Sequence, residues 1–152
     1  MKTRIIGLGN TLLTDDGVGI CVAREATLRL ADTAIDVVET EAAGFALLEL
    51  MVGWDRVVLV DAIAFDGVVP GTIVPIDPAD LRTSLRLRSV HEIDLPTVLG
   101  LGRAMGFDMP SEVRVFGIQV EDALTLGEHL TDTVRAVVPQ AVDAVVAAAT
   151  GA

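Results

Sequence analysis

The sequence predicts an α/β fold, a three-layer α/β/α sandwich around a central, mostly parallel sheet. Short apolar runs typical of strands alternate along the chain with segments of helical periodicity. The run at 56–63 contains the unbroken apolar stretch V-V-L-V, which is typical of a strand buried on both faces, as in parallel sheets. The chain has 152 residues and shows no linker or internal repeat, so we expect one domain spanning residues 1–152.

The first half of the chain supplies three strands and two helices. Ile5–Leu8 is a short apolar run that ends at the turn pair Gly9-Asn10, which predicts a strand followed by a loop. After Gly17 the apolar residues recur with helical spacing, which predicts a helix from about Asp16 to Leu30. The same criteria then predict a strand at Ile35–Glu39, a short helix at Phe45–Met51 and the buried strand at Arg56–Ile63.

The second half continues the alternation. The glycines at 67 and 71 delimit a loop before a strand at Thr72–Ile76, and residues 78–88 read as a short helix followed by a loop. Next come a helix at Leu95–Met105, a strand at Glu112–Ile118 and an irregular acidic segment up to Leu130. Thr131 is a favourable N-cap for a last helix that ends near Ala149.

Composition excludes several classes of function. Eleven basic residues against 22 acidic ones give a net charge of −11, which argues against binding to nucleic acid and to anionic membranes. No apolar run reaches the roughly 20 residues of a membrane helix, and the beginning of the chain lacks the pattern of a signal peptide. The single cysteine, Cys21, lies on a predicted apolar helix face, which favours a buried structural thiol over a nucleophile. We therefore expect a cytoplasmic protein.

The loop after the first strand carries two adjacent carboxylates, Asp15 and Asp16. Thr14 or Asp15 can cap the first turn of the following helix, where negative charge is favourable. One residue is enough for that purpose, and adjacent side chains point in different directions, so the other carboxylate can face the cleft above the strand. The glycines around this loop do not match the dinucleotide-binding fingerprint, and an acidic pair disfavours a pyrophosphate.

Two further residues fall at the same predicted edge of the sheet. Asp61 ends the buried strand and His91 precedes the helix at 95–105, while sites in such sheets lie at the carboxyl ends of the strands. Asp61 can instead cap its own turn, and His91 can be an ordinary loop histidine bonded to the backbone. Together with Asp16 they form a set of two oxygen donors and one nitrogen donor, which suits nickel, zinc or manganese at an open site. The same three groups also suit general acid–base catalysis on a water molecule.

Three motifs in this sequence resemble the [NiFe]-hydrogenase maturation endopeptidases. They are G-L-G-N-T-L-L-T-D-D-G-V-G at 7–19, V-D-A at 60–62 and S-V-H-E at 89–92. The resemblance covers nearly the whole chain and implies the same three-layer sandwich. It implies an enzyme that removes the C-terminal extension of a hydrogenase large-subunit precursor once nickel is inserted. One departure is that Glu39-Thr40-Glu41-Ala42-Ala43-Gly44 stands where many members have Asp-Gly-Gly-Thr, which bears on the choice of hydrogenase.

Residue roles follow from this resemblance. It implies that Asp16, Asp61 and His91 contact the metal, and that Asp16 or Asp61 activates the attacking water. The nickel is carried by the substrate, although other divalent ions suit the same donors. The expected partner is the hydrogenase large-subunit precursor, with no nucleic acid and no membrane, and we expect a monomer.

Two other functions remain compatible with the residues. A non-catalytic assembly factor can hold a nickel-loaded subunit with the same trio without cutting it. A small-molecule hydrolase or nucleotide-binding enzyme rests on the analogy of the fold alone.

Overall fold

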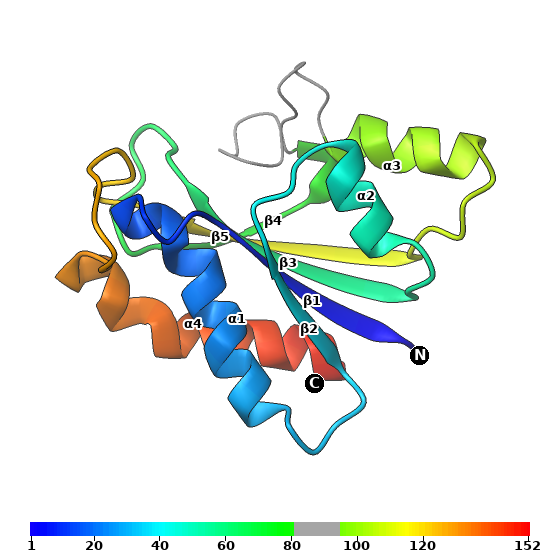
Figure 1. Ribbon diagram of the computed structural model, residues 1–152, viewed down its shortest axis with the longest axis horizontal. Coiled ribbons are helices and arrows are strands. Elements are labelled where there is room, and N and C mark those ends of the chain that lie inside the picture. The colour runs from blue at the N-terminus through cyan, green and yellow to red at the C-terminus, as the bar shows by residue number, and fades with distance from the viewer. Residues whose placement is uncertain (81–94) are drawn as a thin grey trace.

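The sheet found in the structure has five strands. The computed structural model describes residues 1–80 and 95–152, and the sheet within them has the strand order β2-β1-β3-β5-β4 (Figure 1). The strands are β1 (Thr3–Leu8), β2 (Asp36–Thr40), β3 (Arg56–Ile63), β4 (Ile73–Ile76) and β5 (Glu112–Gln119). The helices are α1 (Val18–Arg29), α2 (Phe45–Met51), α3 (Leu95–Ala104) and α4 (Asp132–Thr150), with short 3₁₀ helices η1 (Thr14–Gly17) and η2 (Pro78–Asp80). The predicted α/β class and mostly parallel sheet are confirmed.

Four strands are parallel and the edge strand β4 is antiparallel to β5. In β4, Pro75 lies opposite Phe116. A proline cannot donate to the ladder, so it is tolerated only where one side of the strand has no partner. The sequence prediction of a strand at 72–76 is thus correct, and its position at the edge explains the proline.

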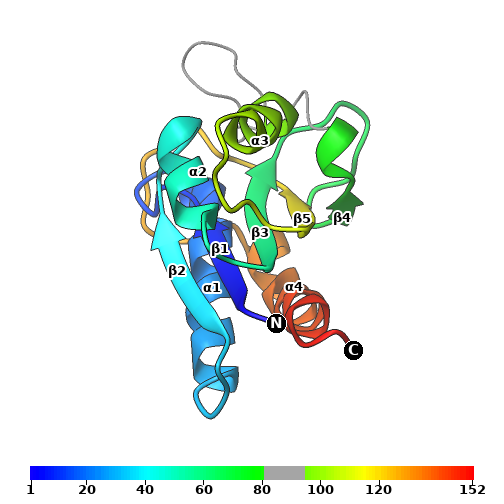
Figure 2. The ribbon, with the colours of Figure 1, turned by 90° about the vertical axis from the view of Figure 1, so that its right-hand side faces the viewer.

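The helices cover both faces of the sheet. Helices α1 and α4 lie on one face, and α2 and α3 lie on the other (Figures 1 and 2). Alternation along β3 supplies both cores, with Val58 and Val60 packed toward α1 and α4, and Val57 and Leu59 packed toward α2 and α3. No helix within the described ranges combines the length and the apolar character needed to span a bilayer.

Helix α1 begins later than predicted, because residues 14–17 form the separate 3₁₀ turn η1. The helix then lies very close to the sheet at Gly19, where a Cβ would be 2.2 Å from the carbonyl oxygen of Leu8 and 2.5 Å from that of Val60. Only glycine permits this approach. It places the start of α1, and with it η1, directly over the carboxyl ends of β1 and β3.

The chain reverses its direction across the sheet at this point. From β1 it passes through α1 to β2 on one side, and from β2 it passes through α2 to β3 on the other side of β1. The gap between the carboxyl ends of β1 and β3 is therefore the topological switch point, where open α/β sheets bind their ligands.

Candidate active site at the carboxyl edge of the sheet

Three loops meet beside the switch point, and hydrogen bonds connect them. The loop after β1 pairs with the loop after β5, since Leu13 and Gly127 form a parallel bridge and Thr14 N–H donates to the Gly127 carbonyl at 2.9 Å. The loop after β3 is held by Gln119, whose amide accepts from Phe65 N–H at 2.9 Å and donates to the Phe65 carbonyl at 3.2 Å. These loops surround a cavity of about 510 Å³ whose lining includes Leu13, Asp16, Ala64, Gln119 and Leu124.

Asp16, a candidate site residue from the sequence, lies in η1 and lines this cavity. Its side chain is only 4% exposed, and its Oδ2 accepts a hydrogen bond from Asn10 N–H at 3.1 Å. The loop can close this tightly because Gly9 has no Cβ. A Cβ at this position would lie 2.3 Å from the carbonyl oxygen of Asp16. The G-N turn of the opening motif thus shapes the backbone around the Asp16 carboxylate.

Asp61 lies inside β3 rather than at its end, because β3 continues to Ile63. On the side of β1 the pairing of β3 ends at Val60, opposite Gly7, so there Asp61 does follow the last paired residue, as predicted. On the side of β5 the pairing continues, and Asp61 pairs with Gly117. The side chain is fully buried, and Ala62 N–H donates to its Oδ1 at 2.8 Å. By strand alternation it faces the α2 and α3 side. Burying a carboxylate this deeply is costly unless hydrogen bonds, an opposite charge or a cation compensates it.

The third predicted ligand, His91, lies outside the described residues. Among 1–80 and 95–152, no group of three or more histidine, cysteine, aspartate or glutamate side chains could hold a metal ion. The elements that carry Asp16 and Asp61 do meet, because η1 packs against β3 at the switch point. The structure therefore brings two of the three predicted residues to one edge of the sheet.

The capping role considered for Thr14 and Asp15 is wrong. In the part of the chain that the structure describes, neither η1 nor α1 has a side-chain capping hydrogen bond, and their N-cap positions are Leu13 and Gly17. Asp15 is fully buried and accepts hydrogen bonds from the N–H groups of Glu121, Asp122 and Thr131 at 3.0, 3.0 and 2.8 Å. The Thr131 hydroxyl also donates to this carboxylate at 2.9 Å, so Thr131 occupies the N-cap position of α4 without capping it through its side chain. Asp15 thus connects the first loop to the segment before α4.

With this geometry established, the comparisons with known proteins decide the family. A family model described as hydrogenase maturation protease matches residues 20–148. The chain belongs to the hydrogenase maturation protease family. The chain is therefore a peptidase. The matched range includes positions 61 and 91, and Asp16 lies just before it.

Individual relatives and solved structures match nearly the whole chain. The chain is 27% identical to the hydrogenase 2 maturation protease of Escherichia coli K12 over 97% of its own length and 90% of the relative's. It is 30% identical to the hydrogenase expression/formation protein HupD of Rhizobium leguminosarum, covering 93% and 71% of the two chains. Among solved structures, the E. coli hydrogenase maturating endopeptidase HybD superposes with a TM-score of 0.79 at 28% identity, covering 99% and 93%.

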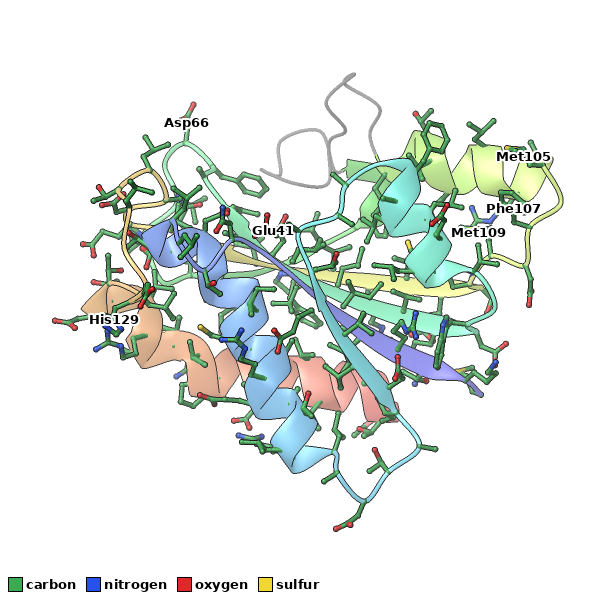
Figure 3. All side chains as sticks on the ribbon, in the orientation of Figure 1. Glu41, Asp66, Met105, Phe107, Met109 and His129 are labelled. Atoms are coloured by element: carbon green, nitrogen blue, oxygen red, sulfur yellow. The ribbon has the colours of Figure 1, made fainter. Side chains whose placement is uncertain are left out.

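The segment in which this family member departs from the motif begins with the last two residues of β2, Glu39 and Thr40, and continues beyond the strand. Glu39 binds Arg24 of α1, with Nε to Oε1 at 3.0 Å, and this hydrogen bond raises the pKa of Arg24. Glu41 lies just beyond β2 (Figure 3), and both glutamates line a cavity of about 210 Å³ that also contacts Gly9. The departing residues are therefore adjacent to the first loop, and sequence alone gave no signal of the Arg24–Glu39 pair.

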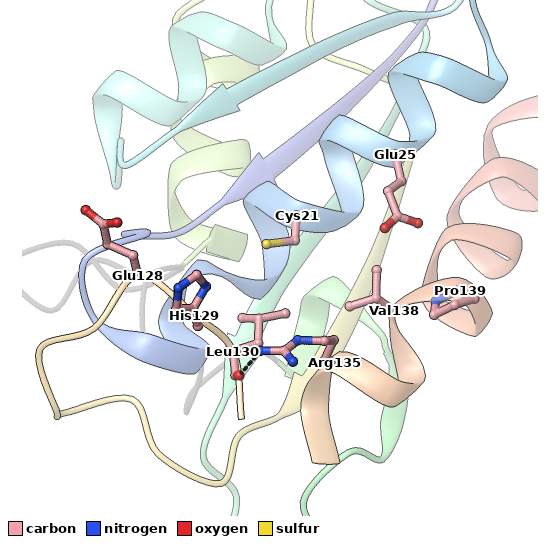
Figure 4. A pocket seen from close by; sticks show the side chains of 8 residues that line it. All are labelled: Cys21, Glu25, Glu128, His129, Leu130, Arg135, Val138 and Pro139. Atoms are coloured by element: carbon pink, nitrogen blue, oxygen red, sulfur yellow. Dashed lines mark hydrogen bonds between the residues drawn. The ribbon is translucent and has the colours of Figure 1, made fainter. Parts of the chain in front are cut away.

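Cys21 is half-buried rather than buried in the core. It lines a separate cavity of about 680 Å³ together with Glu25, His129 and Arg135, on the α1 and α4 side of the sheet (Figure 4). Burial raises the pKa of the Cys21 thiol above its ordinary value, which keeps it protonated near neutral pH. This favours the predicted inert thiol over a nucleophile in this protease.

Proposed function

We propose that this chain is an endopeptidase that removes the C-terminal extension of a [NiFe]-hydrogenase large-subunit precursor after nickel insertion. One observation carries the proposal. In a member of the hydrogenase maturation protease family, the elements bearing two buried carboxylates, Asp16 and Asp61, meet at the switch point of the sheet. The catalytic groups of a water-activating peptidase need to be held rigidly, and both carboxylates have main-chain hydrogen bonds that fix them.

The nickel in this proposal is part of the substrate. Asp16, Asp61 and His91 are proposed to contact it from the protease side, so that only a loaded precursor is held correctly. Two carboxylates and one imidazole suit a borderline divalent ion, and zinc or manganese could use the same donors. Two of these donors belong to the described residues. His91 is included in the proposed ligand set only because the S-V-H-E motif at 89–92 resembles that of the family.

A general base in this site would be Asp16 or Asp61. Asp16 lines the cavity of about 510 Å³, and this supports it as the residue nearest the scissile bond. Positioned proton transfer of this kind contributes about 10²–10⁴-fold to a rate. The raised pKa of the Cys21 thiol argues against a cysteine-protease mechanism.

The decisive experiment measures the mass of a large-subunit precursor before and after incubation with the purified chain. We expect loss of a C-terminal fragment from nickel-loaded precursor and no change in nickel-free precursor. Asp16→Asn, Asp61→Asn and His91→Ala should each abolish cleavage. Asp66→Asn, in the exposed loop after β3 (Figure 3), should not.

The outcomes separate the rival functions. Equal cleavage of loaded and nickel-free precursor would reject recognition through nickel. Binding of loaded precursor without any change of mass would identify an assembly factor that does not cut. We further propose that the chain acts in the cytoplasm on this one protein substrate.

A further inference from the structure

Three large apolar side chains are exposed on the two paired loops beside the Asp16 cavity. Leu12, Leu124 and Leu126 are 56%, 91% and 80% exposed. We call these three residues the leucine rim. Single exposed leucines are ordinary, but a group of them on one surface commonly marks a site of interaction.

The two loops that carry the leucine rim are fixed to each other. Gly127 N–H donates to the Leu12 carbonyl at 2.9 Å, and the Thr14 hydroxyl donates to the Thr125 carbonyl at 2.6 Å. These bonds place Leu126, next to Gly127, beside Leu12. The leucines are therefore held in one place before any partner arrives, which lowers the entropy lost on binding.

Local bonds also order the segment from 122 to 125. The Asp122 carboxylate accepts hydrogen bonds from Leu124 N–H and Thr125 N–H, both at 3.0 Å. Hydrogen bonding to Thr125 and Leu124 lowers the pKa of Asp122, so its carboxylate stays ionised at neutral pH and keeps these bonds. Asp122 N–H in turn donates to Asp15, which fixes the segment to η1.

The rim is continuous with the candidate active site. Leu124 lines the same cavity as Asp16, together with the apolar residues Leu13 and Val120, so the rim and the proposed catalytic residue share one cavity. Another exposed apolar pair, Met105 and Phe107, lies at the opposite end of the sheet (Figure 3). That pair touches no part of the Asp16 cavity, so continuity singles out the rim.

We propose that the leucine rim binds an apolar segment of the precursor polypeptide next to the scissile bond. This inference rests on the proposed function, since the occupant is the chain being cut. A second copy of this protein is a poorer occupant, because two chains that each carry a net charge of −11 repel each other. Full burial of one exposed leucine side chain is expected to change an affinity by about ten-fold or more.

The first test compares KM and kcat for nickel-loaded precursor. Leu124→Ser with Leu126→Ser should raise KM at least ten-fold and leave kcat within two-fold, because the rim contributes binding and not chemistry. The control is Leu28→Ser on α1, where Leu28 is 79% exposed and outside the cavity. Unchanged KM in the rim variant, or an equal change in the Leu28 control, would overturn the proposal.

The second test does not depend on cleavage. A photo-crosslinking amino acid in place of Leu126 should label the C-terminal region of the precursor, and the same group in place of Leu28 should not. Labelling of another region, or of a second copy of this chain, would overturn the docking proposal. If the unmodified protein fails to cut the precursor, the proposed function fails, and the crosslinking result still decides the docking surface.

Discussion

Asp15 and Asp16 are adjacent and chemically identical, yet the fold uses them differently. The Asp16 carboxylate lies on the wall of the cavity, whereas the Asp15 carboxylate is surrounded by N–H donors of the segment 121–131. The donors to Asp15 are three backbone N–H groups and the hydroxyl of Thr131. The acidic pair therefore combines a residue that shapes the site with one that faces it.

We expect Asp15→Asn to destabilise the protein by about 2–3 kcal/mol, because a buried amide group would meet N–H donors in place of a carboxylate. Chemical denaturation measures this change in the free energy of unfolding. Hydrogen exchange should also become faster at Glu121, Asp122 and Thr131. Asp143→Asn is the matched control, since Asp143 pairs with Arg29 on the surface, where such pairs contribute about 0–1 kcal/mol.

At the scale of elements, the contact between α1 and the sheet determines where η1 and Asp16 lie. Gly19 makes this contact against the carbonyl oxygens of Leu8 and Val60, which are backbone atoms that cannot rotate away. Any side chain there must displace the helix. The position of the candidate active site thus depends on Gly19, which has no functional group of its own.

Gly19→Ala should therefore reduce stability by about 1–3 kcal/mol, the usual cost of overpacking, and should lower cleavage activity by shifting η1. Gly100→Ala, on the exposed side of α3, where no atom of the described residues lies within 4 Å of an added Cβ, should instead raise stability by about 0.5–1 kcal/mol. Thermal unfolding and activity of both variants check this pair. Equal stability of the two variants would contradict the close-approach argument.

At the scale of the whole molecule, one charged cluster connects the sheet to the last helix at the edge opposite the site. Arg56 donates to Glu112 at 2.8 Å and to the Ala149 carbonyl at 3.2 Å, and Arg114 donates to Glu112 at 2.8 Å. Hydrogen bonds from Arg56 and Arg114 lower the pKa of Glu112. The cluster joins the first residues of β3 and β5 to the end of α4.

This lowered pKa sets the sign of a pH dependence. The contribution of Glu112 to stability is complete above the unfolded-state value, about 4.3, and is lost as the pH falls through the lower folded-state value. Denaturation at several pH values should show Glu112→Gln less stable than the natural protein at pH 7. The two should converge at the acidic end, and a constant difference across the range would be evidence against this assignment.

The overall charge leads to an expectation about assembly. A net charge of −11 on a chain of 15.9 kDa opposes self-association, so we expect a monomer at moderate salt. Light scattering during size-exclusion chromatography should give a mass near 15.9 kDa. A stable dimer would contradict this expectation and would make the leucine rim a candidate for its interface.

The sequence by itself determined the class of fold, and it singled out Asp16, Asp61 and His91 as candidate site residues, whose roles stay predictions. Periodicity gave the strands and helices because the burial of alternating or helically spaced apolar side chains is a local property of the chain. It failed at the start of α1, where η1 precedes the helix. It predicted the bounds of β3 correctly, but Asp61 lies two residues before the end of that strand. The start of α1 depends on hydrogen bonds to a distant segment.

Only the tertiary structure decided how those residues are used. Nothing in the sequence indicated the partners of Asp15, because its donors come from residues more than a hundred positions away. The Arg24–Glu39 pair and the leucine rim likewise arise from contacts between separate elements. Local patterns fix which segments bury their side chains. The loops that follow β1, β3 and β5 meet only in the folded protein. Their contacts determine which buried polar groups have partners and which surfaces remain open beside Asp16.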